Sequence, residues 1–494
     1  MQNLIVIGSG VAGMAAACRL RAKGFTVTVL EANAYPGGKL THFRNNGFRF
    51  DAGPSLFTMP QLLDDVFIQA GKNPRHYYTF QPLNTTGHYF YEDGTRITAY
   101  AEPDQLAKEL HEKLAVAPDV IQHYLAQAKQ TYEMAAHIFL ENSLHKRKTW
   151  LKKEVIRALS SIPKLGIFET MHQRNTRLLH EPRLIQLFDR YATYNGSNPY
   201  RAPGILTSIP HLEFNLGTYF PDGGMHSITE ALYKLATDLG VTFQFNTRVD
   251  EIEVERGITK GVRAGHQFIP ATAVVSNMDV HPTYQKLLPT QPTPKKILAQ
   301  ERSSSALIFY WGINRPFPEL DLHNIFFSEN YEQEFHCLFN KSTLYSDPTI
   351  YINITSKYCP TDAPPGCENW FVMINAPANK GQPWETMISQ ARTNIIKKLN
   401  RLLATNLENH IVAEDLLDPV LIEQKTSSYQ GSLYGTSSNS KMAAFLRHPN
   451  FSGSIKNLYF CGGSVHPGGG IPLCLQSARI TSALMVEHFA RQSV

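Results

Sequence analysis

The chain alternates short apolar runs with polar and glycine-rich stretches, a pattern typical of strands and helices packed in layers. Residues 4–7 and 25–30 are apolar enough for two buried strands, and the small residues between them predict a closely packed helix. Residues 103–140 carry apolar side chains at helical spacing. The apolar run at 306–313 has the length of a buried strand and is too short to span a membrane. Together these segments predict an α/β fold.

A second α/β region is expected beyond residue 217. Ser227 and Glu230 match a capping box, and Gly240 is a C-terminal stop signal, so a helix is expected between them. The other elements expected in this region and at the C-terminal end are strands at 241–245, 272–276 and 458–461 and a helix at 473–489.

The turn between the first expected strand and helix contains Gly8, Gly10 and Gly13. Gly8 permits a tight turn, Gly10 lets the backbone approach a pyrophosphate, and Gly13 lets the helix lie close to the sheet. The helix N-terminus presents free N–H groups and the positive end of its dipole to phosphates. Glu31, 18 residues after Gly13, is placed to accept hydrogen bonds from a ribose diol, which favours NAD or FAD over NADP. The turn therefore predicts a dinucleotide site, which also includes Val11, Ala12 and Ala32.

Composition narrows the class of protein. With 494 residues, the chain is expected to form more than one subdomain. A net charge of +5 is too small to argue for nucleic-acid binding. The six cysteines contain no CxxC pair, so no metal site is predicted and a reducing cytosol is favoured. The first strand begins so close to Met1 that no signal peptide is expected.

Elements expected in the nucleotide sheet lie at both ends of the chain. Nicotinamide dehydrogenases usually keep this unit contiguous, whereas flavin enzymes often split it, so the pattern favours FAD. We expect a split Rossmann-type FAD-binding domain, an inserted mixed-sheet substrate domain and a helical membrane-facing subdomain. The expected boundaries are 1–80, 216–280 and 441–494 for the FAD-binding domain, 81–215 for the helical, membrane-associated substrate region, and 281–440 for the substrate domain.

Four further motifs carry a family resemblance. They are Pro36–Lys39 (PGGK), Gly47–Ser55 (GFRFDAGPS), Tyr219–Met225 (YFPDGGM) and His466–Pro472 (HPGGGIP). Together with the first glycine turn, they resemble the bacterial phytoene desaturase group, the carotenoid desaturase branch of the FAD-dependent amine-oxidase-like superfamily. Many members have glycine where this chain has Ala12. This difference leans towards the branch that acts on modified carotenes, such as the hydroxycarotenoid 3,4-desaturases.

The resemblance implies FAD as the cofactor and further residues that bind it. Gly37 and Gly38 would let the chain approach the diphosphate, and Lys39 would offer a cation. The start of the last helix would stabilise negative charge on the reduced flavin. The other implied cofactor-binding residues are Gly53, Pro54, Ser55, Val249, Asn277, Met278, Gly463, Gly470, Ile471 and Pro472.

The implied activity is desaturation of a carotenoid, in which one hydrogen leaves as hydride to the flavin and its neighbour leaves as a proton. Candidates for the proton acceptor are Asp51, His466 and His211, the last paired with Glu213. For each, a structural role is equally open. Other activities also stay open at this point: carotene cis–trans isomerisation, amine oxidation, or flavin or lipid binding without catalysis.

Residues 145–190 contain 11 basic and four acidic side chains, interleaved with apolar ones. Such a segment is typical of either an anionic membrane interface or the solvated face of a helical lid. Because a carotenoid is about 30 Å long and does not diffuse through water, an entry tunnel at the membrane is expected. The prediction is a cytoplasmic protein, peripherally bound to the inner face of the membrane, with oxygen or a quinone as electron acceptor.

Overall fold

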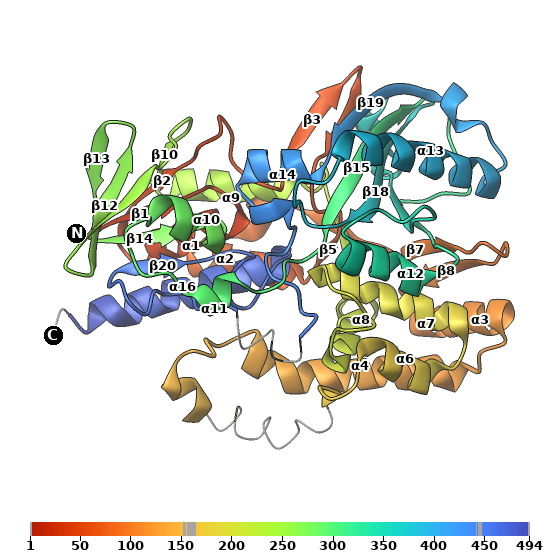
Figure 1. The fold of residues 1–494 in the computed structure, drawn as a ribbon, viewed down its shortest axis with the longest axis horizontal. Helices are drawn as coiled ribbons and strands as arrows, with labels where there is room; N and C mark the ends of the chain where they lie inside the picture. The colour runs from red at the N-terminus through yellow and green to blue at the C-terminus, as the bar shows by residue number, and fades with distance from the viewer. Residues whose placement is uncertain (1, 152–154, 156–164, 441, 443–446, 493–494) are drawn as a thin grey trace.

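Two β-sheets organise the chain in the computed structural model, which describes residues 2–151, 155, 165–440, 442 and 447–492. The first sheet, at the left of Figure 1, is parallel and has the strand order β10-β2-β1-β14-β20. Its strands come from three distant parts of the chain. They are β1 (Asn3–Ile7), β2 (Thr26–Leu30), β10 (Thr242–Gln244), β14 (Ala273–Ser276) and β20 (Leu458–Phe460).

Helices cover this parallel sheet, with α1 (Val11–Ala22) at their centre. Helix α1 contacts both α9 (Ser227–Asp238) and α16 (Ile471–Ala490), and α16 also contacts α2 (Pro60–Gln69). All residues of α1 from Val11 to Leu20 are buried. The helix is therefore enclosed on all sides, which explains its run of alanines and other small residues.

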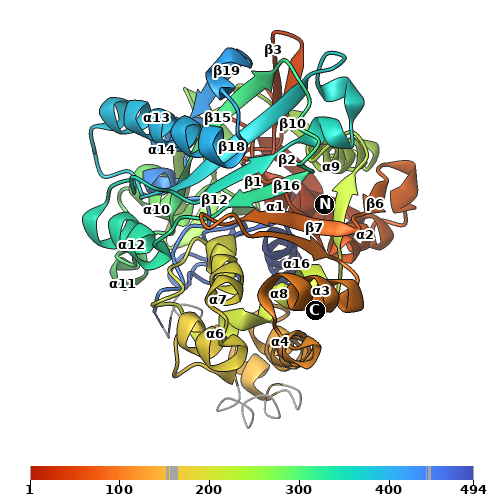
Figure 2. The ribbon, with the colours of Figure 1, turned by 90° about the vertical axis from the view of Figure 1, so that its right-hand side faces the viewer.

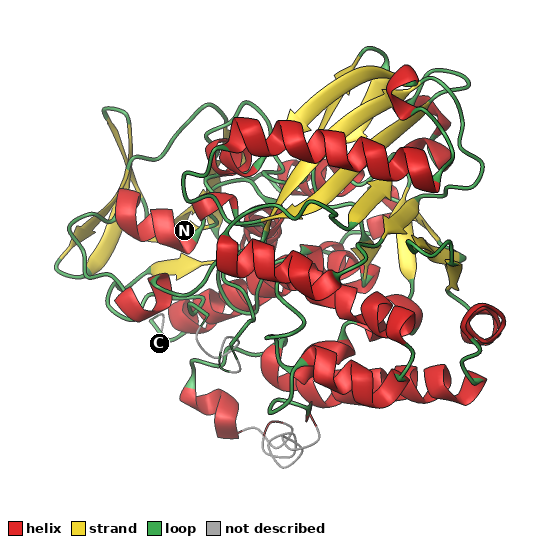
Figure 3. Ribbon diagram, turned by 45° about the vertical axis from the view of Figure 1, so that its right-hand side comes forward, coloured by secondary structure: helices red, strands yellow, loops and turns green. Residues whose placement is uncertain are grey.

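The second sheet, at the right of Figure 1, has seven strands in the order β19-β15-β18-β17-β16-β7-β8. Only the β16–β7 pair is parallel. Helix α13 (Trp384–Leu402) lies across one face of the sheet (Figure 3). The strands are β7 (Thr85–Phe90), β8 (Arg96–Tyr100), β15 (Ser305–Ile313), β16 (His323–Phe326), β17 (Ile350–Asn353), β18 (Glu368–Ala376) and β19 (Ile411–Leu417).

A group of helices packs against the β7–β8 end of the second sheet (Figure 2). They are α3 (Pro103–Leu114), α4 (Pro118–Phe139), α6 (Met171–Leu179), α7 (Pro182–Asp189) and α8 (Pro210–Phe214), followed in places by one-turn segments such as Arg190–Asn195. The single helical segment expected at 103–140 is thus two helices. Ala115 adopts a left-handed φ of 54° and Pro118 begins a new helix, so the first helix cannot continue.

Smaller elements complete the described part of the chain. The short sheets contain β3 (His42–Asn45) with β4 (Phe48–Asp51), β5 (Phe57–Thr58) with β9 (Thr218–Pro221) and β6 (Phe80–Pro82), and β11 (Glu251–Glu255) with β12 (Ile258–Ala264) and β13 (Gln267–Pro270). The short helices are α10 (Val280–Pro282), α11 (Lys295–Leu298), α12 (Tyr331–His336) and α14 (Pro419–Thr426).

The structure confirms the α/β class and corrects two expected helix starts. The capping box at Ser227 is wrong, because Ser227 is the first residue of α9 and its hydroxyl donates to the Gly224 carbonyl at 2.8 Å. The last helix begins at Ile471, two residues before the expected start. The domain boundaries stay a prediction, because the strand order of the two sheets does not show at which residue each domain begins or ends.

Candidate active site

A cavity of about 680 Å³ is lined by residues of both sheets and of the helical group. With one exception, Gly13, every cofactor-binding residue expected from the sequence lines this cavity. The residues come from the carboxyl ends of β1 and β2, the loops after β2, β4, β10, β14 and β20, and the start of α16. This is the edge at which open parallel sheets bind nucleotides.

The first glycine turn explains why Gly13 is the exception. A Cβ on Gly13 would lie 2.2 Å from the Gly8 carbonyl oxygen, so Gly13 permits the close contact between α1 and the strand. Gly8 has a φ of 93°, which disfavours a side chain. A Cβ on Gly10 would lie 2.8 Å from Oδ1 of Asn277. The turn is therefore closed by the residue that follows β14.

Glu31 at the end of β2 is buried and its carboxylate is held by the glycine turn. Oε2 accepts hydrogen bonds from the backbone N–H and the hydroxyl of Ser9, both at 2.8 Å, and Oε1 accepts one from the Asn33 N–H at 2.9 Å. Gly37 donates its N–H to the Ser9 carbonyl at 2.9 Å. The PGGK motif and the first turn therefore form one wall, in which the Glu31 carboxylate has a defined orientation.

Lys39 is anchored to a segment about 390 residues further along the chain. Its Nζ donates to the carbonyls of Leu433 at 2.8 Å and Ser432 at 3.1 Å. Burial lowers the pKa of Lys39 to about 8. An ammonium carries three donors, so Lys39 keeps one for a ligand of the cavity.

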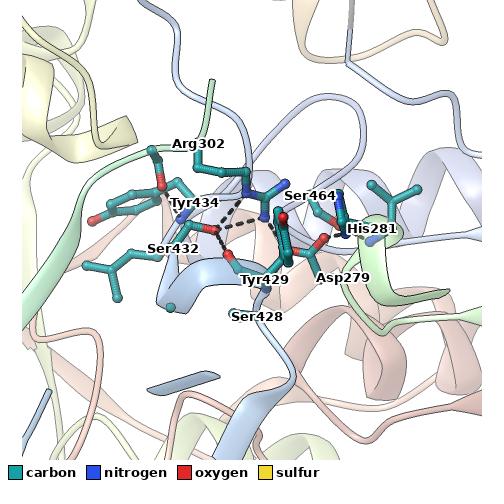
Figure 4. Close-up of polar contacts among 12 residues, drawn as sticks. Asp279, His281, Arg302, Ser428, Tyr429, Ser432, Tyr434 and Ser464 are labelled. Carbon is teal, nitrogen blue, oxygen red and sulfur yellow. Dashed lines mark hydrogen bonds and ion pairs between the residues drawn. The ribbon is translucent and has the colours of Figure 1, made fainter. Parts of the chain in front are cut away.

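Figure 4 shows the polar network that fixes the 428–434 segment against the parallel sheet. Arg302 forms an ion pair with Asp279 and donates to the Ser432 hydroxyl at 2.8 Å, and both charged side chains are buried. Asp279 also accepts from the Tyr429 N–H at 3.3 Å. Sequence reasoning missed Asp279, which lines the cavity directly after Asn277 and Met278. Its position just beyond the end of β14 was the available signal.

The last helix begins at the cavity wall. Gly470 is the N-cap of α16 and has a φ of 101°, a conformation that favours glycine. A Cβ on Gly470 would meet no atom within 4 Å, so conformation and not space accounts for this residue. Pro472, expected at the first helical position, occupies the second. The 20-residue α16 thus places the positive end of its dipole at the cavity.

The three expected proton acceptors have different surroundings. Asp51 does not line the cavity, and its carboxylate accepts from Arg49 at 2.9 Å and from the N–H groups of Met225 and His226 at 2.8 and 3.1 Å. Arg49 also pairs with Asp362. These contacts favour a structural role for Asp51, which fastens β4 to the start of α9.

His211 is not brought together with Glu213. The two side chains share no hydrogen bond, because residues two apart on a helix point to different sides. Glu213 accepts instead from the hydroxyls of Tyr191, at 2.6 Å, and Tyr194. Neither His211 nor Glu213 lines the cavity.

His466 does line the cavity and is buried. Its Nε2–H donates to the Asn142 carbonyl at 2.8 Å, and its Nδ1 has no hydrogen-bond partner. Burial lowers the pKa of His466 to about 4, so the ring is neutral near pH 7. Of the three candidates, His466 alone lines the cavity, and its unpartnered Nδ1 is buried.

Much of the basic segment 145–190 is engaged within the fold. Among its described residues, Arg177 pairs with Glu169, Arg183 with Asp93 and Glu181, and Lys148 with Glu487. Its remaining bases include Lys152, Lys153, Arg157 and Lys164, which lie outside the described residues. The described residues contain no helix that is both long and apolar enough to cross a membrane.

A parallel sheet with a glycine turn, a buried acid at the end of its second strand and a second, mixed sheet beside it is the architecture of a dinucleotide-binding protein. The chain belongs to the flavin containing amine oxidoreductases, which match residues 11–486. It is 51% identical to the 1-hydroxycarotenoid 3,4-desaturase of Flavobacterium sp. (strain P99-3), over 98% of this chain and 99% of that protein. It is 33% identical to the 4,4'-diapolycopene oxygenase of Methylomonas sp., over 97% of each.

Solved structures show the same fold. The cyclohexylamine oxidase of Brevibacterium oxydans IH-35A superposes with a TM-score of 0.63 at 14% sequence identity, over 99% of each chain. An oxidoreductase from Methanosarcina mazei gives a TM-score of 0.64 at 13% identity. These likenesses support the fold alone, whereas the family match makes this chain a flavin-dependent oxidoreductase with FAD as its cofactor.

The residues present fit FAD. The cavity extends from the glycine turn and Glu31, past Lys39, to the start of α16. It is bordered by backbone at Gly10, Gly38 and Gly470, and a side chain on Gly10 would collide with Asn277. Glu31 would hold the ribose, the α1 N-terminus the diphosphate, and the α16 N-terminus the electron-accepting ring.

Proposed function

We propose that this protein is an FAD-dependent desaturase that introduces a C=C bond into a hydroxylated carotenoid. The observation that carries the proposal is the 51% identity to a 1-hydroxycarotenoid 3,4-desaturase over the full length of both chains. The cavity supports it, because its lining joins the cofactor residues to apolar side chains such as Leu206, Ile308 and Met373. An apolar enclosure of this kind suits a polyene and excludes water.

Bound FAD supplies a two-electron acceptor that takes one hydride from carbon. The neighbouring carbon would lose a proton, so that one C–H electron pair leaves with the hydride and the other forms the new C=C bond. Molecular oxygen or a quinone would accept the two electrons in the end. The positive start of α16, at the cavity wall, would stabilise negative charge on the reduced ring. We assign the proton to His466, since Asp51 and His211 do not line the cavity.

We further propose that the substrate enters from a membrane surface beside Leu151 and Phe168. Leu140 and Ile167 line the cavity, and Phe168 follows Ile167 in the chain. The side chains of Leu151 and Phe168 are 77% and 73% exposed. Large apolar side chains this exposed suit insertion into a lipid interface. This arrangement corresponds to a protein bound peripherally to the inner face of the membrane.

The proposal is tested by incubating the FAD-loaded protein with liposomes that contain a 1-hydroxycarotenoid, with oxygen or with a quinone under anaerobic conditions. We expect a red shift of carotenoid absorption and a product that has lost two hydrogen atoms by mass spectrometry. A product that has gained oxygen indicates an oxygenase, and an unchanged mass with a changed retention time indicates an isomerase. Either result, or peroxide release from amines without a change in any carotenoid, overturns the proposal.

A further inference from the structure

The cavity has a polar end whose residues, apart from Ser55, lie outside every cofactor motif. Its lining includes Ser55 after β4, Arg190 after α7, Tyr194, His323 at the start of β16, and Tyr351 in β17. Polar side chains in an otherwise apolar cavity are costly to bury unless they serve one another or a ligand. These residues form hydrogen bonds to one another, and His323 keeps a donor for a ligand.

Hydrogen bonds join Ser55, Tyr351 and His323 in a chain. The hydroxyls of Ser55 and Tyr351 lie 2.8 Å apart, and the Tyr351 hydroxyl lies 2.7 Å from Nδ1 of His323. Asn353 fixes the direction of this chain. Its Nδ2 donates to the Leu322 carbonyl at 3.0 Å, which identifies that atom as the amide nitrogen, and it also lies 3.3 Å from Nδ1 of His323.

Nδ1 of His323 is therefore a hydrogen-bond acceptor, so the neutral ring carries its proton on Nε2. Burial, reinforced by the Arg190 cation, lowers the pKa of His323 to about 3, which keeps the ring neutral near pH 7. Among the described residues, the hydrogen bonds of the His323 ring involve Nδ1 alone, and none involves Nε2. A side chain 4% exposed that lines the cavity thus has one oriented donor to offer.

Arg190 forms the other wall of the polar end. It donates to the hydroxyls of Tyr89 at 3.0 Å and Tyr194 at 3.2 Å, and Tyr194 in turn donates to the buried carboxylate of Glu213. The guanidinium also lies over the rings of these two tyrosines. The Arg190 cation is therefore balanced by Glu213 through Tyr194 and held in place at the cavity wall.

We propose that this polar end is a binding site for the hydroxyl group of the substrate, with His323 Nε2–H as its donor. The inference rests on the proposed function, in which the substrate is a hydroxycarotenoid. A hydroxyl on carbon 1 is separated from a 3,4-bond by a single methylene carbon, so its binding site must adjoin the site of hydride transfer. Ser55 meets this condition, because the Gly53–Ser55 segment lines the cavity on the cofactor side.

The test compares kcat/KM for a 1-hydroxycarotenoid and for the same carotene without the hydroxyl. We expect the wild-type protein to prefer the hydroxylated substrate, and His323→Leu to lower that preference about tenfold by removing one buried donor. His323→Gln keeps an N–H donor and is expected to restore part of the preference. Tyr132→Phe is the matched control, because Tyr132 lines the same cavity on α4, outside the polar end, and should change both values equally.

Flavin content and thermal unfolding of each variant show whether it is folded and loaded. Equal kcat/KM for both carotenes in the wild type would overturn the inference while leaving the desaturase in place. An unchanged preference in flavin-loaded His323→Leu would overturn it as well. Failure of the wild type to desaturate either carotene would instead contradict the proposed function itself.

Discussion

The walls at the two ends of the cavity differ, because one is formed largely by backbone and the other by side chains. At the cofactor end the wall is largely backbone, with Gly8, Gly10, Gly37 and Gly470 at positions that exclude a side chain or require a positive φ. At the polar end the wall is side chain, supplied by Arg190, Tyr194, His323 and Tyr351. A wall made of backbone cannot give way to an added side chain, whereas a wall made of side chains can change its chemistry one residue at a time. The first end suits a constant cofactor and the second a variable substrate.

The largest effect is expected from adding a side chain to the cofactor end. In Gly10→Leu the new Cβ would lie 2.8 Å from Oδ1 of Asn277, and the rest of the side chain would occupy space next to the turn. We expect a cost of about 3 kcal/mol and FAD binding weakened about 100-fold. Flavin absorbance of the purified protein and titration of the apoprotein with FAD measure this change.

Gly453→Ala is the control, because a Cβ on Gly453 meets no atom within 4 Å and its φ is not positive. It should retain the wild-type flavin content. A Gly10→Leu protein that binds FAD normally would contradict the placement of the cofactor at this turn and, with it, the contrast between the two ends.

The same contrast explains which parts were predictable from the sequence. Gly8 and Gly10 form a local pattern because the geometry of a turn requires glycine at fixed spacing, so the cofactor end could be identified from residues 4–31 alone. His323 and Arg190 are 133 positions apart and line the same cavity only because the fold brings β16 and the residue after α7 to it. No periodicity marks either residue. The expected pairing of His211 with Glu213 failed for the related reason that closeness in sequence does not bring side chains together.

Asp51→Asn tests whether Asp51, which does not line the cavity, has a structural role and no catalytic one. Asp51 precedes Gly53–Ser55 and is bonded to Arg49 and to the first N–H groups before α9. Because Arg49 keeps Asp362 as a partner, we expect the free energy of unfolding to fall by about 2–3 kcal/mol, less than for a fully orphaned buried charge. Chemical denaturation measures the loss of stability, and kcat per bound flavin should stay at the wild-type value.

Asp362→Asn is the matched variant, since it removes the other carboxylate that pairs with Arg49 and leaves Asp51 in place. Both variants should lose stability and keep kcat. If Asp51→Asn alone abolishes turnover while its flavin content and stability remain normal, Asp51 takes part in the chemistry. Its assignment to a structural role would then be wrong.

The smallest effect is expected at the proposed membrane entrance, beside Leu151 and Phe168. Arg177, Arg183 and Lys148 are already ion-paired, so charge removal at these positions would disturb the fold as well as any lipid contact. Leu151 and Phe168 give a cleaner test because they are highly exposed. We expect Leu151→Ser with Phe168→Ser to weaken binding to anionic vesicles about fivefold, or about 1 kcal/mol, since interfacial insertion buries only part of each side chain.

Ile68→Ser is the control for this pair, because Ile68 is 61% exposed on α2 and does not line the cavity. Vesicle sedimentation compares the three proteins, and desaturation is measured with the carotenoid presented in vesicles and in detergent. If the substrate enters from the membrane beside Leu151 and Phe168, the double variant loses activity with vesicles and keeps it in detergent. Equal vesicle binding by the double variant and the wild type would contradict a membrane contact at Leu151 and Phe168. The proposed hydroxyl site at His323, which lines the cavity, would be unaffected by that result.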